Sequence, residues 1–536
     1  MSSTLFRNGV FWIGLANSQT FDGMVIKDGK IHSLGAAALL EKTDYEIDLQ
    51  GQFLMPAFAD GHTHPLFGGR QFFGPQISDL TSIQDIVDEV KRFATTNPDL
   101  EWIVGGTYDP ALDPKGNFDA RWLDDAVSDR PVVLRGMDYH TIWVNSEALK
   151  RCGITAETPD LEIGTIVRRQ DGTPMGTLRE WDAVDLVLNK VPAPSLAREI
   201  AALAHSCERY AKHGLAWWQD AWVDRGISEV YLAAEEAGAI TVGVNLAFRA
   251  DPRTWRADMS YFLEQRKKIE TSPRNKNLTA HTIKFFSDGI IEGGTAALLQ
   301  PYSDDPCSYG MPVWSAVALK EAVIAFDALG FQVHIHAIGD AGIRQALDAI
   351  EGAQAVNPTW DRRPVIAHVQ LLDPQDLPRF AKLGVLANFG PLWTRQDPMQ
   401  EISSAPRIGP ERSARQYQMR TLIDSGARLT FGSDWPVTSE IPLAGMPVPV
   451  HRQTPDRKPV GGWIPEEKIR IDEAMAAYTS NVSYQAFGDE EWGTLEIGKD
   501  ATFIILNGNP LDIDAFDISA LEIQATYRKG KLLYSK

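Results

Sequence analysis

Cysteine is scarce in this sequence. The 536 residues include three cysteines, and no two of them form a C-x-x-C pair. This scarcity excludes a disulfide framework and a zinc site built from thiolates. A metal ion in this protein would therefore be held by histidine, carboxylate or modified side chains. The three positions are Cys152, Cys207 and Cys307.

Long apolar runs and clusters of basic residues are also missing. No window approaches 18 uninterrupted apolar residues, and residues 1–9 lack the charged start and apolar middle of a secretory signal. The formal net charge of -19 argues against a nucleic-acid or anionic-membrane partner, because both are bound through clustered lysine and arginine. We expect a cytoplasmic protein that acts on a small-molecule substrate, and the acidic surface is compatible with a homodimer.

The two ends of the chain are rich in short β-like segments. Residues 10–13, 23–31 and 45–49 near the start resemble residues 493–506 and 523–534 near the end in this respect. We therefore predict a small β-sandwich domain built from both termini, with residues 1–55 as one part and residues 486–536 as the other.

Between these ends, strand candidates alternate with amphipathic segments of helix length. This alternation predicts a (β/α)8 barrel of the TIM type over residues 56–485, with its chemistry at the carboxyl ends of the strands. Residues 68–213 are too long for one barrel helix and predict an insertion that serves as a lid. The opening strand candidate covers residues 54–65, and the others are residues 214–220, 240–246, 279–286, 330–336, 364–368, 384–389 and 427–434.

The first predicted barrel strand ends in two histidines, His62 and His64, with one residue between them. Residues two apart on an extended backbone point to the same face, so both imidazoles can reach one metal ion. A lone H-x-H pattern also fits two partly buried histidines that bond to the backbone. The rest of the sequence has to decide between the two interpretations.

Further ligand-type residues fall on other predicted strands. Lys284 stands in the fourth, His334 and His336 end the fifth, His368 ends the sixth and Asp434 ends the eighth. Singly, each has a structural interpretation, for example a salt-bridged lysine, a core histidine or a helix N-cap. Polar ends on five strands of one barrel instead favour a single site.

This arrangement resembles the amidohydrolase superfamily, in particular the branch of N-substituted formamide deformylases and related metal-dependent hydrolases. The resemblance covers nearly the whole chain. It depends on residues 56–64 (PAFADGHTH), 284–289 (KFFSDG), 295–302 (TAALLQPY), 336–340 (HAIGD), 368–370 (HVQ) and 432–436 (GSDWP).

The resemblance implies a binuclear metal centre. His62, His64 and Asp434 would hold one divalent ion, and His336 and His368 would hold the other. Lys284, carboxylated on its side-chain nitrogen, would bridge both ions, because a carbamate is an anionic oxygen donor whereas an ammonium cannot ligate. Imidazole and carboxylate donors suit zinc first, although manganese or iron would also fit.

The implied reaction is hydrolysis of a non-peptide C–N bond in a linear amide, N-substituted formamide or carbamate. A hydroxide held by the metals would attack the carbonyl, with Asp434 as general base and then general acid. The alternatives are another reaction of the same fold, such as deamination, ester hydrolysis or isomerisation, and a catalytically silent barrel used for binding or regulation.

Other residues are candidates for support or substrate contact. His334 repeats the H-x-H spacing with His336 and is either a supporting residue or the true ligand in its place. We expect Asp288 and Asp340 to fix loops beside the site. We expect residues at strand ends and in the insertion to contact the substrate. These candidates are Asp288, Asp340, Gln219, Asp220, Trp393, Trp435, Glu180, Tyr108 and His140.

Overall fold

The computed structural model describes residues 3–137, 139–159, 161 and 164–536. The chain divides into two compact units. The barrel unit comprises Met1–His64, Ala204–Asp434 and Ser439–Lys536, and the insertion unit comprises Pro65–Leu203 and Trp435–Thr438. No helix in the described part of the chain is long and apolar enough to cross a membrane.

Eight parallel strands form the centre of the barrel unit, and the predicted barrel fold is confirmed. Their order is β18-β17-β16-β15-β14-β13-β12-β6, so the first and last strands in sequence are the two ends of the sheet. These ends contact each other, which brings the sheet close to a closed barrel. The strands are β6 (Phe58–Thr63), β12 (Leu215–Val223), β13 (Gly243–Arg249), β14 (Leu278–Phe286), β15 (Gln332–Ala337), β16 (Val365–His368), β17 (Leu386–Phe389) and β18 (Arg428–Phe431).

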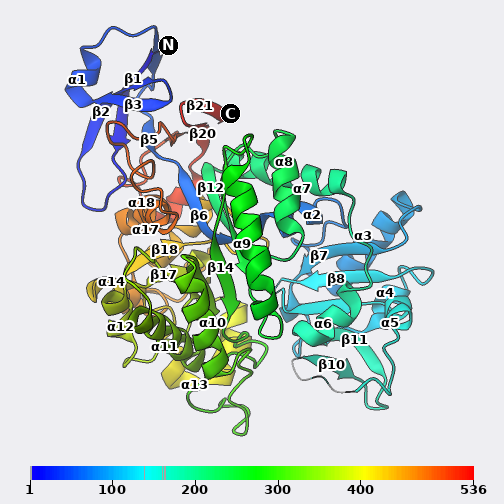
Figure 1. Ribbon diagram of the computed structural model, residues 1–536. Helices are drawn as coiled ribbons and strands as arrows, with labels where there is room; N and C mark the ends of the chain where they lie inside the picture. Colours follow the sequence, from blue (N-terminus) through cyan, green and yellow to red (C-terminus); the bar gives the residue numbers. More distant parts are fainter. Residues whose placement is uncertain (1–2, 138, 160, 162–163) are drawn as a thin grey trace. The chain divides into compact units, whose positions relative to one another are not determined.

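Helices connect these strands, as a parallel barrel requires. Helices α9 to α11 flank the strands on the outside (Figure 1). The helices that precede or follow the barrel strands are α7 (Leu196–Lys212), α8 (Ile227–Glu236), α9 (Trp255–Thr271), α10 (Ala316–Ala328), α11 (Asp340–Val356), α12 (Leu377–Leu383), α13 (Ala405–Ser413), α14 (Met419–Asp424), α15 (Pro442–Gly445), α16 (Val448–His451), α17 (Ile471–Ala477) and α18 (Ser480–Gln485).

The opening apolar run is divided between two sheets. Residues Phe53–Pro56 form β5 of the terminal sheet, and the barrel strand begins only at Phe58. Ala57 lies between the two strands, and its N–H donates to Thr502 O. Both segments are fully buried, so hydrophobicity alone does not mark the boundary.

Both chain ends contribute strands to the same β unit, as predicted, and these strands form one eight-stranded sheet. Its order is β21-β20-β19-β5-β1-β2-β3, with β4 paired to β1. The N-terminal strands (blue) and the C-terminal strands (red) lie together in this sheet (Figure 1). Its strands are β1 (Ser3–Trp12), β2 (Thr20–Lys27), β3 (Lys30–Leu34), β4 (Tyr45–Asp48), β5 (Phe53–Pro56), β19 (Phe503–Leu506), β20 (Ile523–Arg528) and β21 (Lys531–Ser535), and the short helix α1 (Gly35–Leu39) follows β3.

The insertion unit has its own five-stranded sheet, in the order β10-β11-β9-β8-β7. Its apolar core includes Ile86, Val90, Phe118 and Trp143. Its elements are α2 (Pro65–Gln71), α3 (Ile83–Thr96), β7 (Ile103–Tyr108), α4 (Ala120–Asp124), β8 (Val132–Gly136), β9 (Thr141–Val144), α5 (Ser146–Cys152), β10 (Thr165–Arg168), β11 (Pro174–Arg179) and α6 (Trp181–Leu188).

Candidate metal centre

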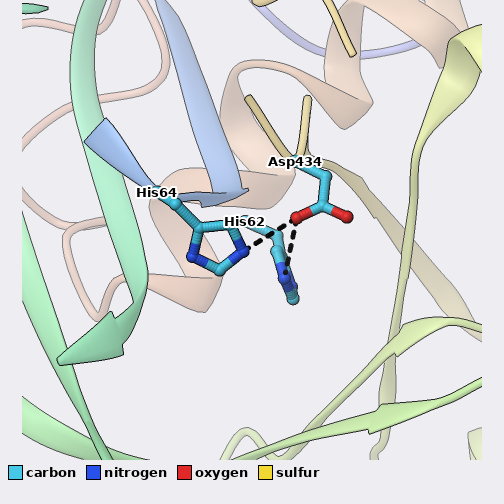
Figure 2. Close-up of side chains that lie close together, drawn as sticks. All are labelled: His62, His64 and Asp434. Atoms are coloured by element: carbon cyan, nitrogen blue, oxygen red, sulfur yellow. Dashed lines mark ion pairs between the residues drawn. The ribbon is translucent and has the colours of Figure 1, made fainter. Parts of the chain in front are cut away.

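His62, His64 and Asp434 lie together where the first and eighth barrel strands end. Asp434 Oδ1 is 2.9 Å from His64 Nε2 and 3.5 Å from His62 Nε2 (Figure 2). All three residues are buried, and one ligand atom from each lies within 4.8 Å of the others. This is the donor set expected for one divalent ion.

The backbone holds Asp434 in place after β18. Its φ of 57° is in the left-handed region, which aspartate tolerates better than most residues. Its N–H donates to His62 O at 2.8 Å, so the turn that carries the carboxylate is bonded directly to β6. Gly432 makes this approach feasible, because a Cβ there would lie 2.6 Å from His62 Cβ.

Lys284 reaches the same group of side chains from β14. It is fully buried, and its Nζ lies 3.3 Å from His62 Nε2 and 4.7 Å from the ring centre of Phe286. Burial lowers the pKa of Lys284 to about 7, and the charge of Asp434 opposes this effect only in part. A lysine in this state is a neutral amine for much of the time near neutral pH.

His334 contacts His62 rather than Asp434. Its Nε2 lies 2.8 Å from His62 Nδ1, and the backbone register of β14 and β15 places His334 opposite Lys284. His334 Nδ1 is buried and finds no hydrogen-bond partner among the described residues. This geometry fits a side chain that orients His62, and it leaves His334 available as a ligand.

His336 and His368 form the other side of the group. Their ring centres lie 4.6 Å apart, and the His368 ring lies 4.8 Å from that of His62. His336 Nε2 donates to Gly289 O at 3.1 Å, which leaves Nδ1 as its lone-pair nitrogen. The five histidines and Lys284 therefore form one continuous buried cluster with Asp434.

The charge state of the cluster suits metal ligands. Burial, followed by the nearby Lys284 and the neighbouring histidines, holds the pKa of His62 well below its usual value. Burial likewise lowers the pKa values of His334 and His368. Neutral imidazoles can donate a lone pair to a cation, and together with the Asp434 carboxylate they match the nitrogen and oxygen donors that zinc prefers. The residues present therefore fit a divalent metal centre.

Asp288 and Asp340 hold loops beside the cluster. Asp288 accepts hydrogen bonds from the backbone N–H groups of Ala297, Ile338 and Gly339, which ties the loops after β14 and β15 together. Asp340 begins α11 and accepts from the N–H of Leu299. Both placements agree with the loop-fixing interpretation.

Two candidates on β12 face different directions. Gln219 Oε1 accepts from Asn245 Nδ2 at 2.9 Å, within a polar network of neighbouring barrel strands. Asp220 accepts from the Tyr231 hydroxyl at 2.6 Å, and Tyr231 belongs to α8, which places this carboxylate on the helix side of the strand. The structure does not bring Asp220 into the histidine cluster.

Aromatic rings lie against the histidines. Trp393 stacks on His368 at 5.3 Å between ring centres, Phe286 lies 5.2 Å from His336, and Trp222 lies 6.0 Å from His64. Trp222 and Phe286 also contact each other, at 4.9 Å. Trp393 was a predicted contact residue, whereas Trp222 was not, because the sequence does not show which side of β12 each tryptophan occupies.

The remaining candidates belong to the insertion unit. His140 and Glu180 are buried and paired, with 2.8 Å between Nδ1 and Oε2. Tyr108 is part of the apolar core of this unit, with its ring 4.6 Å from that of Phe118. Trp435 packs against Gly68, where a Cβ would meet the indole ring at 2.4 Å.

Sequence reasoning missed three buried residues that support the cluster: Asp60, Tyr210 and Ser433. Asp60 accepts hydrogen bonds from both other residues. The signal for Asp60 was available, because it precedes His62 by two positions on the same strand. Nothing in the sequence pattern singles out Tyr210 on α7.

Comparison with known proteins identifies the family. The model described as "Amidohydrolase family" matches residues 45–534. The chain belongs to the amidohydrolase family. With His62, His64 and Asp434 in ligating positions, it is a metal-dependent hydrolase of that family.

Relatives of this amidohydrolase extend over nearly its whole length. It is 30% identical to Protein LONG AFTER FAR-RED 3 of Arabidopsis thaliana, with 100% of this chain and 92% of the relative covered. It is 24% identical to an N-substituted formamide deformylase of Arthrobacter pascens, with 97% of this chain and 96% of the relative covered. An uncharacterized metal-dependent hydrolase from Pyrococcus horikoshii OT3 has the same fold, with a TM-score of 0.76 and 22% sequence identity. The match covers 96% of this chain and 99% of that structure.

Proposed function

We propose that this amidohydrolase cleaves a non-peptide C–N bond in a small linear amide, N-substituted formamide or carbamate. The observation that carries the proposal is the buried cluster in which Asp434 contacts His62 and His64 while Lys284 reaches His62. The similarity to an N-substituted formamide deformylase supports the choice of bond.

In this proposal the cluster holds two divalent ions, with zinc as the first choice. His62, His64 and Asp434 would hold one ion, His336 and His368 would hold the other, and Lys284, as its carbamate, would supply oxygen donors to both. When bound, such ions supply positive charge that acidifies water and polarises a carbonyl. His334 orients His62 through the contact between their ring nitrogens.

Asp434 moves the proton in the proposed reaction. Its Oδ1 lies between His62 and His64, so its carboxylate borders the place where water would be held. It takes a proton from the attacking water and returns it to the nitrogen of the leaving amine, as general base and then general acid. An amide or formamide gives an amine and a carboxylic acid, whereas a carbamate ester gives an amine, carbon dioxide and an alcohol.

The aromatic rings support a substrate with an apolar group. Trp222, Phe286 and Trp393 lie against three different histidines of the cluster, and aromatic walls of this kind favour apolar or aryl substituents. We therefore propose a hydrophobic substituent on the nitrogen or on the acyl side.

The test is metal analysis followed by a substrate panel. Purified protein is assayed for zinc, manganese and iron, and then for amine release from formamides, acetamides and carbamates that carry either a benzyl or a methyl group on nitrogen. We expect metal-dependent hydrolysis with a higher kcat/KM for benzyl compounds. Hydrolysis of esters but of none of these amides, in metal-loaded protein, would contradict the assignment.

A further inference from the structure

The candidate metal centre spans the seam of the barrel. β18 and β6 contact each other, but no ladder of backbone hydrogen bonds joins them in the described structure. All the other pairs of neighbouring barrel strands are joined by such a ladder. His62 and His64 belong to the β6 side and Asp434 to the β18 side. The distance between them therefore depends on what closes this seam.

Asp60 links both sides of the seam. Its Oδ1 accepts from the backbone N–H of Ser433 at 2.9 Å, and its Oδ2 accepts from the Ser433 hydroxyl at 2.5 Å. Oδ1 also accepts from the backbone N–H of His62 at 3.3 Å. One carboxylate thus bonds to the residue before Asp434 and to the first histidine of the metal centre.

Tyr210 fixes the carboxylate from a third direction. Its hydroxyl donates to Asp60 Oδ2 at 3.1 Å and lies 2.6 Å from the hydroxyl oxygen of Thr63. Thr63 lies between His62 and His64, so α7 is also connected to the strand that carries both ligands. Asp60, Thr63 and Tyr210 are completely buried, and water does not compete for these bonds.

We propose that Asp60 is a positioning residue that holds Asp434 at ligating distance from His62 and His64 by bonding Ser433 across the seam. This inference depends on the proposed metal-dependent function. Asp60 does not touch the substrate or a metal ion in this role. It acts by restricting the turn after β18, where Asp434 has its left-handed backbone conformation.

The chemistry of the four hydrogen bonds to Asp60 predicts the order of metal affinity among variants at this position. Two donors are fixed backbone N–H groups, and the other two are hydroxyls that can rotate and accept instead. Asparagine at position 60 can keep the bonds from the backbone through its oxygen and donate to the hydroxyls through its nitrogen. Alanine loses all four.

The experiment measures metal affinity by chelator competition and metal content by elemental analysis, without reference to activity. We expect Asp60→Ala to bind metal about 10- to 100-fold more weakly than the wild type, which is the usual effect of removing a residue that orients ligands. Asp60→Asn should recover most of the lost affinity. Ser433→Ala keeps the backbone bond to Asp60 and should lose less metal affinity than Asp60→Ala. This variant also tests the proposal if Asp60→Ala does not fold.

Thr430→Val is the matched control. Thr430 lies on β18, and its hydroxyl bonds Asn388 and Gln485 rather than Asp60. We expect this variant to lower the unfolding temperature while its metal affinity stays at the wild-type value. Equal affinity in the wild type, Asp60→Ala and Ser433→Ala would overturn the positioning role, as would an Asp60→Asn variant as weak as Asp60→Ala. Absence of metal binding by the wild type would instead refute the proposed function.

Discussion

Asp434 Oδ1 lies 2.9 Å from His64 Nε2, although these two residues follow the last and the first strands of the barrel. The contact exists because the sheet brings its ends together, so that residues far apart in sequence share one face. A carboxylate beside an imidazole at this distance serves two purposes. It completes a metal-ligating set, and in the proposed reaction it is also the proton acceptor.

Replacement of Asp434 by asparagine should separate these purposes. The amide oxygen can still ligate, but it cannot accept a proton at neutral pH. We expect kcat to fall by about 10²- to 10⁴-fold, the usual contribution of a general base, with a smaller loss of metal affinity. Steady-state kinetics on metal-loaded protein, with metal content measured in the same samples, provide the check.

The matched control for this variant is Asp361→Asn, because the Asp361 side chain is exposed and pairs with Arg363. Its kcat and metal content should equal those of the wild type. If Asp434→Asn retained full kcat in metal-loaded protein, another group would have to move the proton.

Lys284 should take up carbon dioxide. Burial lowers its pKa to about 7, so a large fraction is neutral amine at pH 8, and only the neutral amine reacts to form a carbamate. We expect a carbamate signal in carbon-13 NMR spectra of metal-loaded protein supplied with labelled bicarbonate. Lys284→Ala should lack that signal and bind less metal.

Removal of carbon dioxide provides an independent readout. Metal-free protein prepared without bicarbonate should bind metal weakly and recover when bicarbonate is added, whereas Lys284→Ala should not respond. A wild-type protein that binds two metal ions with no carbamate signal would contradict the bridging role.

The barrel strands were predictable because most of them are apolar runs that stop at a turn or a polar residue. The exception was the first strand, since Phe53–Pro56 and Phe58–Thr63 are both buried and look like one strand in the sequence. Only pairing with distant strands separates them: β5 pairs with β19, and β6 pairs with β12. Such pairing has no local sequence signal.

The candidate ligands were predictable for a different reason. His62, His64, His368 and Asp434 each stand at or just after a strand end, where a barrel gathers its polar side chains. The contact between His334 and His62 was not predictable from the sequence, because it depends on the register between strands. Gln219 and Asp220 are adjacent on β12 and therefore point to opposite faces of the strand, and Asp220 bonds Tyr231 of α8 on the helix side.

Gly432 should be sensitive to the smallest substitution. A Cβ at this position would lie 2.6 Å from both the Cβ and the backbone nitrogen of His62, and backbone atoms cannot move aside cheaply. We expect Gly432→Ala to destabilise the protein by about 1–3 kcal/mol, as overpacking does, and to weaken metal binding. Denaturant unfolding and chelator competition measure the two effects.

The control is Gly508→Ala, where the added Cβ would approach only Leu521 Cδ2, the end of a flexible side chain. Stability and metal affinity should stay near wild type. A Gly432→Ala protein with unchanged metal affinity would show that β6 and β18 can separate without disturbing the ligands.

His281 should make the protein sensitive to acid. Burial and the charge of Arg266 lower its pKa from 6.5 to about 4, so the unfolded chain binds a proton that the folded chain does not. The stability that His281 contributes is complete above pH 6.5 and is lost as the pH falls through 4. The pKa shift sets an upper limit of about 3 kcal/mol for this loss. The actual loss is smaller, because the residue is partly exposed and solvent screens its charge. We expect His281→Gln to reduce the difference in unfolding free energy between pH 7 and pH 4.5, measured with urea. An identical pH profile for His281→Gln and the wild type would show that His281 is protonated equally in both states.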